Sequence, residues 1–175
     1  MLIDAPAAAE KGDPQEPGDH ALGRSRGGFS TKIHLLCDGH GLPLHFCLTA
    51  GQVNESIALD VLLEQADAEL LDGEGVPLAW PVALGGDRAY RADWIDQYLI
   101  DLGIQPVIPA RQTENRAKRP HFDARKYRRR NVIERLIGWL KEARRIFARY
   151  EKTAKNYAGM LTLAFIKQYL KYELV

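Results

Sequence analysis

Two alternating runs joined by a turn constrain the fold of this 175-residue chain most strongly. Polar and apolar residues alternate in "FSTKIHLLCD" (29–38) and again in "LPLHFCLTA" (42–50), and the "GHG" between them is typical of a turn. Because successive side chains on a strand point to opposite faces, this pattern predicts a β-hairpin.

The segments after the hairpin switch between helical and strand patterns, which indicates an α/β fold: a mixed sheet with helices on its faces. The last helix is apolar on so many sides that we expect it to pack across the sheet. In chain order, the predicted elements are a helix over 54–71, a strand over 76–87, a helix over 91–103, a strand over 104–110, a basic loop over 111–126, and helices over 127–147 and 154–174.

Composition favours one domain in a reducing compartment. Residues 1–28 are rich in Pro, Gly, Ala and Asp and predict an irregular or disordered arm, which leaves residues 29–175 as the domain. The two cysteines, Cys37 and Cys47, are too few for a secreted disulfide framework. No apolar run is long enough for a membrane helix and no signal peptide is recognisable, so we expect a cytoplasmic protein without a membrane partner.

The net charge of +1 conceals a strong asymmetry. Residues 111–150 hold 14 Lys and Arg against 4 Asp and Glu, whereas residues 1–110 hold 6 against 17. A basic block of this kind indicates a polyanionic partner, and nucleic acid is the commonest one.

Two acidic residues stand at positions suited to chemistry. Asp87 ends an apolar strand, where side chains of α/β sheets meet ligands. Glu134 lies inside the basic helix, and on a helical wheel it shares an arc of about 60° with Tyr127, Arg130 and Lys141. Carboxylate oxygens at these places suit Mg²⁺. A solvated Arg130–Glu134 ion pair at spacing four is the alternative for the glutamate.

Asp87 also has an alternative interpretation, as the cap of the helix that begins near residue 92. It lies early for that role, and Asp93 is the better cap.

The segments "LGGDRAY" and "YRRRNVIERLIGWLK" resemble the catalytic core of DDE transposases from bacterial insertion sequences of the type-four and type-five superfamily. The signature of that family is Tyr, two residues, Arg, three residues, Glu, six residues and Lys, which Tyr127, Arg130, Glu134 and Lys141 meet in full. The resemblance extends from about residue 20 to the end. It implies a ribonuclease-H-like fold for residues 29–175.

The resemblance also implies a mechanism and partners. Asp87 and Glu134 would hold Mg²⁺ or Mn²⁺ for DNA strand cleavage and strand transfer, supported by Tyr127, Arg130 and Lys141. The partners implied are transposon ends and target DNA, bound by a homo-oligomer. Further phosphate contacts are expected from four arginines: Arg24, Arg26, Arg128 and Arg129.

The chain departs from the family pattern at the first catalytic aspartate. Asp4 is the candidate for this third metal ligand, but the residues after it do not match the family. "GQVNES" also replaces the His-Asp-Ser that relatives tend to show. Two interpretations follow from the first departure: a partial chain that works with an upstream reading-frame product, or a catalytically dead DNA-binding or assembly fragment.

Two further interpretations compete with these. Four residues around the hairpin could bind zinc, although their spacing is not a common zinc pattern: Cys37, His40, His45 and Cys47. The basic helix could instead dock on a membrane or in a partner groove, which would give Glu134 no special role.

Overall fold

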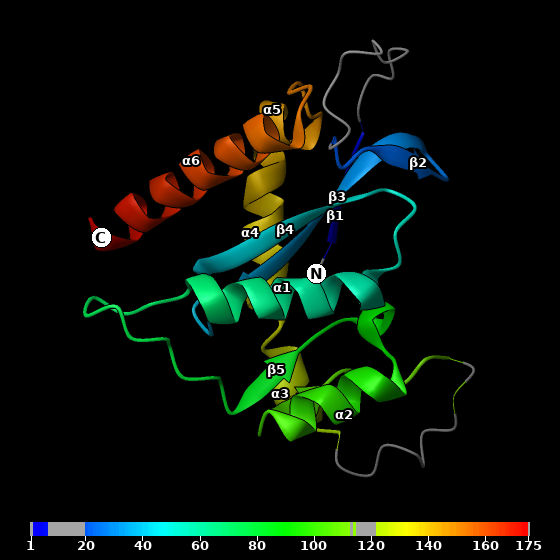
Figure 1. The fold of residues 1–175 in the computed structure, drawn as a ribbon, viewed down its shortest axis with the longest axis vertical. Coiled ribbons are helices and arrows are strands. Elements are labelled where there is room, and N and C mark those ends of the chain that lie inside the picture. Colours follow the sequence, from blue (N-terminus) through cyan, green and yellow to red (C-terminus); the bar gives the residue numbers. More distant parts are fainter. Residues whose placement is uncertain (1, 7–19, 113, 115–121, 175) are drawn as a thin grey trace.

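The computed structural model of the protein describes residues 2–6, 20–112, 114 and 122–174, and it shows a mixed α/β architecture (Figure 1). The strands are β1 (Leu2–Pro6), β2 (Gly23–Ser25), β3 (Gly28–Cys37), β4 (Pro43–Ala50), β5 (Ala83–Gly85) and β6 (Gln105–Val107). The helices are α1 (Glu55–Glu69), the 3₁₀ turn η1 (Arg88–Tyr90), α2 (Asp93–Asp101), α3 (Ala124–Arg128), α4 (Asn131–Glu142), α5 (Arg144–Phe147) and α6 (Ala154–Glu173).

The predicted hairpin is confirmed and forms the centre of a four-stranded antiparallel sheet. Strand β3 pairs with β1, β2 and β4, and His34 lies opposite Cys47 in the hairpin register. The turn is closed by Asp38, whose carboxylate accepts hydrogen bonds from the backbone N–H groups of His40 and Leu42. Gly41 supplies the positive φ of 90° that the turn requires.

Strands β1 and β2 fall within residues 1–28, so the prediction of a wholly irregular arm is wrong there. Both strands pair antiparallel with β3, and their backbone groups gain ladder hydrogen bonds that composition alone does not reveal. Residues 7–19 lie outside the described part of the chain.

The single mixed sheet predicted from the sequence is instead divided into two. Strands β5 and β6 pair in parallel as a separate two-stranded sheet. The predicted strand over 76–87 is shortened to β5, and Pro77 and Pro81 lie in the part that is lost. Proline has no N–H to donate to a ladder, which restricts where pairing can occur.

Helices cover both faces of the four-stranded sheet, as Figure 1 shows. On one face, Ile33 and Leu35 of β3 pack against α4, α5 and α6, which confirms that the last helix crosses the sheet. This core contains the following residues: Ile33, Leu35, Leu136, Ile137, Leu140, Ile146, Tyr157, Leu161 and Phe165.

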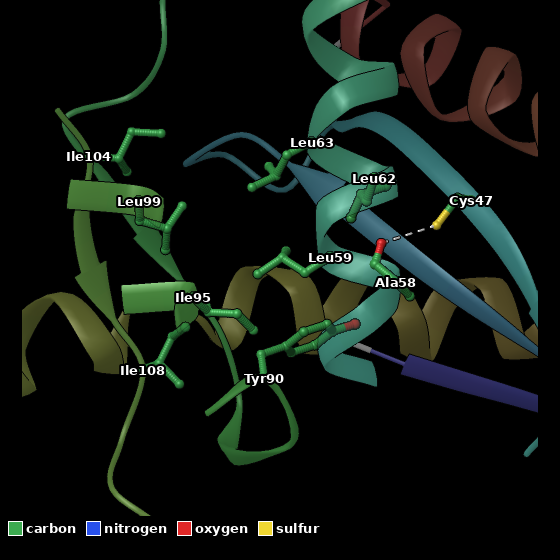
Figure 2. Packing of buried hydrophobic residues seen from close by; sticks show 10 residues of the cluster. All are labelled: Cys47, Ala58, Leu59, Leu62, Leu63, Tyr90, Ile95, Leu99, Ile104 and Ile108. Carbon is green, nitrogen blue, oxygen red and sulfur yellow. Dashed lines mark hydrogen bonds between the residues drawn. The ribbon is translucent and has the colours of Figure 1, made fainter. Parts of the chain in front are cut away.

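On the other face, α1 packs between β4 and the layer formed by η1, α2 and β6 (Figure 2). The Sγ of Cys47 donates to the carbonyl of Ala58 at 3.7 Å and ties β4 to α1. This second core holds η1 and the carboxyl end of β5 against the main sheet.

The helix predicted over 127–147 is interrupted at two places. Helix α3 ends before Arg129 and α4 begins at Asn131, with a tight turn in which the N–H of Arg130 donates to the carbonyl of Tyr127 at 3.1 Å. Ala143 is extended, at φ −79° and ψ 98°, and separates α4 from α5. The hydrophobic period continues across both breaks, which explains why the sequence pattern predicts one helix.

Arg149 joins the segment before β2 to the segment before α6. The residue is 4% exposed, and its guanidinium donates to the carbonyls of His20, Ala21 and Lys152 and contacts the Thr31 hydroxyl. Its Cζ lies 5.1 Å from the centre of the Tyr157 ring. A buried charge is tolerated only when it is hydrogen-bonded in this way.

We predict that Arg149→Met lowers the free energy of unfolding by roughly 3 kcal/mol, because several buried carbonyls lose a charged donor. Urea denaturation followed by circular dichroism measures the change. Arg144→Met, at an exposed arginine of the neighbouring helix, serves as the control and should change the free energy by less than about 1 kcal/mol. Equal effects of the two substitutions would contradict the anchoring role.

Candidate active site at the end of β5

Asp87 lies two residues after the end of β5 and is partly buried. Its Oδ1 accepts a hydrogen bond from the N–H of Ala89 at 2.8 Å, so that Asp87 caps η1. The expectation that it does not cap α2 is confirmed, but Asp93 is not that cap either: Ala92 occupies the position and makes no side-chain cap. The cap holds the Asp87 carboxylate at the carboxyl end of a parallel strand.

Glu134 lies in the first turn of α4 and pairs with Arg130. Its Oε1 is 2.8 Å from Nη2 of Arg130, and 43% of the glutamate side chain is exposed. The Cζ of Arg130 lies 4.8 Å from the centre of the Tyr127 ring. The structure therefore brings three of the four signature residues into contact, and it contains the ion pair that the sequence offers as the alternative to a metal ligand.

Lys141 stands apart from this group. It occupies an exposed position in the last turn of α4, seven residues and about 10.5 Å of helix rise beyond Glu134.

A cavity of about 570 Å³ connects the end of β5 with the α3–α4 turn. Asp87 lines it together with three cationic side chains, those of Lys126, Arg129 and Arg130. The remaining wall includes apolar residues such as Leu36, Trp80 and Ile133, and two further aspartates, Asp38 and Asp67. Positive charge beside an acidic strand end suits a ligand that carries phosphate groups.

The described residues do not form a complete metal site. Among the side chains that the structure describes, no three His, Cys, Asp or Glu residues lie close enough together to hold a metal ion. The backbone of Asp4 lies in β1 opposite Lys32 of β3, and its side chain is outside the described part.

The zinc alternative is not supported. Cys37, His40, His45 and Cys47 do not gather into a cluster within the described chain. Burial raises the pKa of both cysteine thiols to about 11, and the imidazole of His45 lies near Gln65 and Glu69 of α1 instead.

The arginines expected to contact DNA are all exposed. Arg24 belongs to β2 and Arg26 to the turn that follows, whereas Arg128 and Arg129 lie at the end of α3. Arg129 lines the cavity beside Asp87. Arg24 and Arg26 come from the N-terminal part of the sequence.

One ion-pair cluster beside the site is missed by sequence reasoning. Arg91, directly after η1, is 5% exposed and pairs with Asp93, Asp96 and Glu114 at 2.5–3.0 Å. Glu114 also accepts from the N–H of Arg111, which fastens the start of the basic loop next to η1. A sequence separation of 23 residues between Arg91 and Glu114 leaves no local signal of this contact.

His34 is a second missed residue. Its imidazole is fully buried, with Nδ1 3.0 Å from the Tyr90 hydroxyl and Nε2 2.8 Å from the Thr49 hydroxyl. Loss of hydration on burial lowers the pKa of His34 to about 4, so the ring is neutral at pH 7. A neutral imidazole has one donor and one acceptor nitrogen, and the two hydroxyl groups can satisfy both.

Comparison with known proteins decides the family. Residues 6–166 match the family model described as "Transposase DDE domain". The chain belongs to the DDE transposase family. A protein named as a transposase for insertion sequence element IS402, from Burkholderia cepacia, is 34% identical over 146 residues, which are 83% of this chain and 64% of that protein. The chain thus spans less than two thirds of that relative.

A second relative is covered more fully. A protein named as a transposase for insertion sequence element IS6501, from Brucella ovis, is 30% identical over 136 residues, which are 78% of this chain and 95% of that protein. No solved structure matches the chain. None of the helices that the structure describes is long and apolar enough to cross a membrane.

The pKa of His34 predicts how the stability of this transposase-family chain depends on pH. The unfolded state binds a proton near pH 6.5 and the folded state only near pH 4, so stability is fully present above pH 6.5 and declines as the pH falls towards 4. We expect a loss of roughly 2 kcal/mol by pH 4.5 from this group.

Urea denaturation at pH 7.5, 5.5 and 4.5 measures this effect. His34→Gln should flatten the decline, whereas His40→Gln, at an exposed histidine, should leave it unchanged. An unaltered decline in His34→Gln would show that another group is responsible.

Proposed function

We propose that the chain is the catalytic part of an insertion-sequence transposase, which cleaves and joins DNA strands. The observation that carries the proposal is the cavity at which the Asp87 strand end meets the cationic α3–α4 turn, beside the Tyr127–Arg130–Glu134 contact chain. Membership of the DDE family supports it. The DNA partners are the transposon ends and the target, bound by a homo-oligomer.

For the fold, we propose a ribonuclease-H-like catalytic domain over residues 29–175, with β1 added at the edge of β3. Antiparallel pairing of β1, β3 and β4, then α1, then the parallel strands β5 and β6 supports this assignment. The strand end that carries Asp87 then corresponds to the ligand-binding edge of an α/β sheet.

Asp87 and Glu134 fit a divalent metal in the chemistry of their ligand atoms, since Mg²⁺ and Mn²⁺ prefer carboxylate oxygens. The number of ligands is too small, because no third carboxylate among the described residues completes a metal site with them. We assign Asp4, or a residue of an upstream reading-frame product, as the candidate third ligand. A bound metal would activate the attacking oxygen and stabilise the leaving oxygen of a phosphodiester.

The cationic residues have separate tasks in this proposal. Arg130 is held between the Tyr127 ring and the Glu134 carboxylate, so it orients the glutamate at the start of α4. Lys126 and Arg129 line the cavity and are exposed, which allows them to contact DNA phosphates. Lys141 lies farther along α4. In this proposal it contacts a DNA phosphate away from Asp87 and does not contact Glu134.

A second candidate function is DNA binding or assembly without catalysis. The observation in its favour is that Glu134 is engaged by Arg130 and that the described side chains supply no three-residue metal cluster. It predicts that the purified chain retains DNA but does not cleave it.

We expect Mg²⁺-dependent cleavage of transposon-end DNA by the purified chain to fall by about two orders of magnitude or more in Asp87→Asn and in Glu134→Gln, because each removes a metal-binding charge. A gel assay on labelled DNA measures it. Glu142→Gln, at an exposed glutamate of the same helix, is the matched control and should cleave normally. Wild-type cleavage that survives both substitutions would refute the assigned site, and DNA retention with no cleavage by the wild type would establish the second candidate.

DNA affinity should also depend on salt. Replacing Arg128 and Arg129 together by Ala should make the negative slope of log K against log salt concentration less steep by about 1.8, because two phosphate contacts are lost. Fluorescence anisotropy on duplex DNA at several salt concentrations measures the slope. Lys167→Ala, on the exposed face of α6, is the control. An unchanged slope in the double variant would remove these arginines from the DNA interface.

A further inference from the structure

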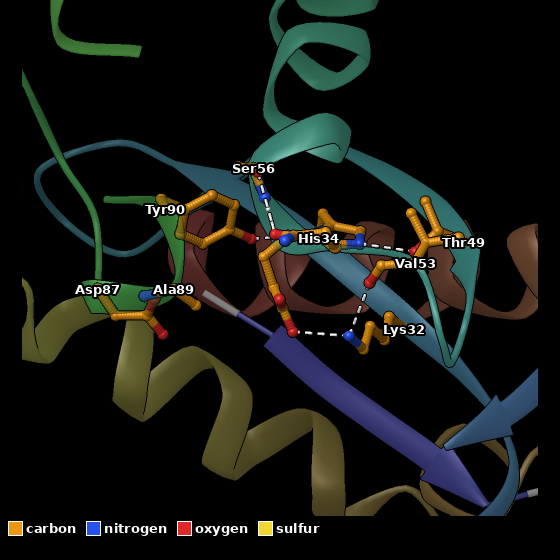
Figure 3. A network of polar contacts seen from close by, with 10 residues as sticks. Lys32, His34, Thr49, Val53, Ser56, Asp87, Ala89 and Tyr90 are labelled. Atoms are coloured by element: carbon orange, nitrogen blue, oxygen red, sulfur yellow. Dashed lines mark hydrogen bonds and ion pairs between the residues drawn. The ribbon is translucent and has the colours of Figure 1, made fainter. Parts of the chain in front are cut away.

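We propose that Tyr90 and His34 are positioning residues for Asp87: the buried hydroxyl–imidazole contact between them fixes the η1 turn that holds the Asp87 carboxylate at its place in the site. The inference rests on the proposed function in one respect: there, the positioned Asp87 carboxylate is a metal ligand. The contact itself, the turn and the cap are features of the structure (Figure 3).

Asp87 is held weakly by its own strand. Strand β5 is three residues long, and among the described residues it pairs only with β6. The turn that follows is a single 3₁₀ turn, closed by the N–H of Tyr90 on the carbonyl of Asp87 at 3.2 Å. So short a turn cannot fix its own position, since the 3₁₀ hydrogen bond has poor geometry.

Tyr90 attaches this turn to the main sheet. Its side chain is 3% exposed and packs in the core formed by α1, α2 and β6 (Figure 2). Its hydroxyl reaches Nδ1 of His34 on β3, and Nε2 of the same ring reaches Thr49 on β4. A chain of contacts therefore runs from β4 through β3 to η1 and on to the residue that begins the turn.

Burying the polar groups of Tyr90 and His34 costs hydration free energy, which apolar side chains at the same places would not lose. Burial raises the pKa of the Tyr90 hydroxyl well above its usual value and keeps it protonated. A buried imidazole and hydroxyl lose their hydration, which mutual hydrogen bonding only offsets. Phenylalanine at position 90 and leucine at position 34 would fill the same space. What the polar pair adds is a single rotamer and position for Tyr90, and with it a defined position for η1.

The Ala89 amide reports directly on this positioning, because its N–H donates to Oδ1 of Asp87. Tyr90→Phe removes only the hydroxyl. We expect this variant to exchange the Ala89 amide hydrogen roughly tenfold faster, because the turn opens more often. We also expect it to bind Mn²⁺ about tenfold more weakly, as substitutions of residues that orient metal ligands do.

Tyr157→Phe is the matched control. Tyr157 is also fully buried and loses one hydroxyl hydrogen bond, to the carbonyl of Ile146, but it lies in the core on the other face of the sheet. The two variants should lose similar stability, whereas only Tyr90→Phe should change the Ala89 exchange and the Mn²⁺ affinity. Equal changes in both variants, or wild-type behaviour of Tyr90→Phe, would overturn the proposal.

Hydrogen exchange by NMR and Mn²⁺ titration by electron paramagnetic resonance on the full chain provide the two measurements. If Tyr90 acts through Asp87, the Tyr90→Phe change should have no further effect on Mn²⁺ affinity in the Asp87→Asn background. A further loss there would show that Tyr90 acts on the metal site by another route, against the proposal. If the wild type binds no Mn²⁺, the metal role of Asp87 is refuted, and the Ala89 exchange rates alone decide whether Tyr90 positions the turn.

Discussion

Strand β3 has hydrogen-bonding neighbours on both edges and packed helices on both faces, and this double burial sets the positions of the other elements. Its alternation sends Ile33 and Leu35 to the core with α4, α5 and α6, and sends His34 to the opposite face, where α1 and η1 lie. A shift of one residue in register would exchange the two faces and place an imidazole in the larger apolar core. The sheet register therefore determines both the packing of the helices and the place of the buried contact between His34 and Tyr90.

The distribution of charge agrees with this arrangement. Part of the basic block folds into α3 and α4, and Lys126, Arg129 and Arg130 around the α3–α4 turn line the cavity at the end of β5. Cations at the α3–α4 turn attract a polyanion, while the aspartates of the cavity lining leave acidic oxygens available beside it. For the proposed function, that combination is the electrostatic setting in which a phosphodiester would approach acidic ligands.

The parts of the fold that could be predicted from the sequence are those encoded by local patterns. The hairpin and α6 followed from periodicity, and the place of Asp87 followed from the apolar run before it. The break at Arg129 and Arg130 could not, because the hydrophobic period passes through it unchanged. The contact of His34 with Tyr90 spans 56 residues, and no local pattern carries a signal at that separation. Whether Asp87 and Glu134 share a metal stays a prediction.

At Asp87, the oxygen that caps the turn and the negative charge of the carboxylate are two separate properties. The Ala89 N–H needs only an oxygen on a short side chain, and asparagine offers one in the same place. Aspartate at this position thus contributes its acceptor geometry to the backbone and its negative charge to whatever occupies the cavity. The two properties are separable, so asparagine or serine at this position could keep the turn intact while removing the charge.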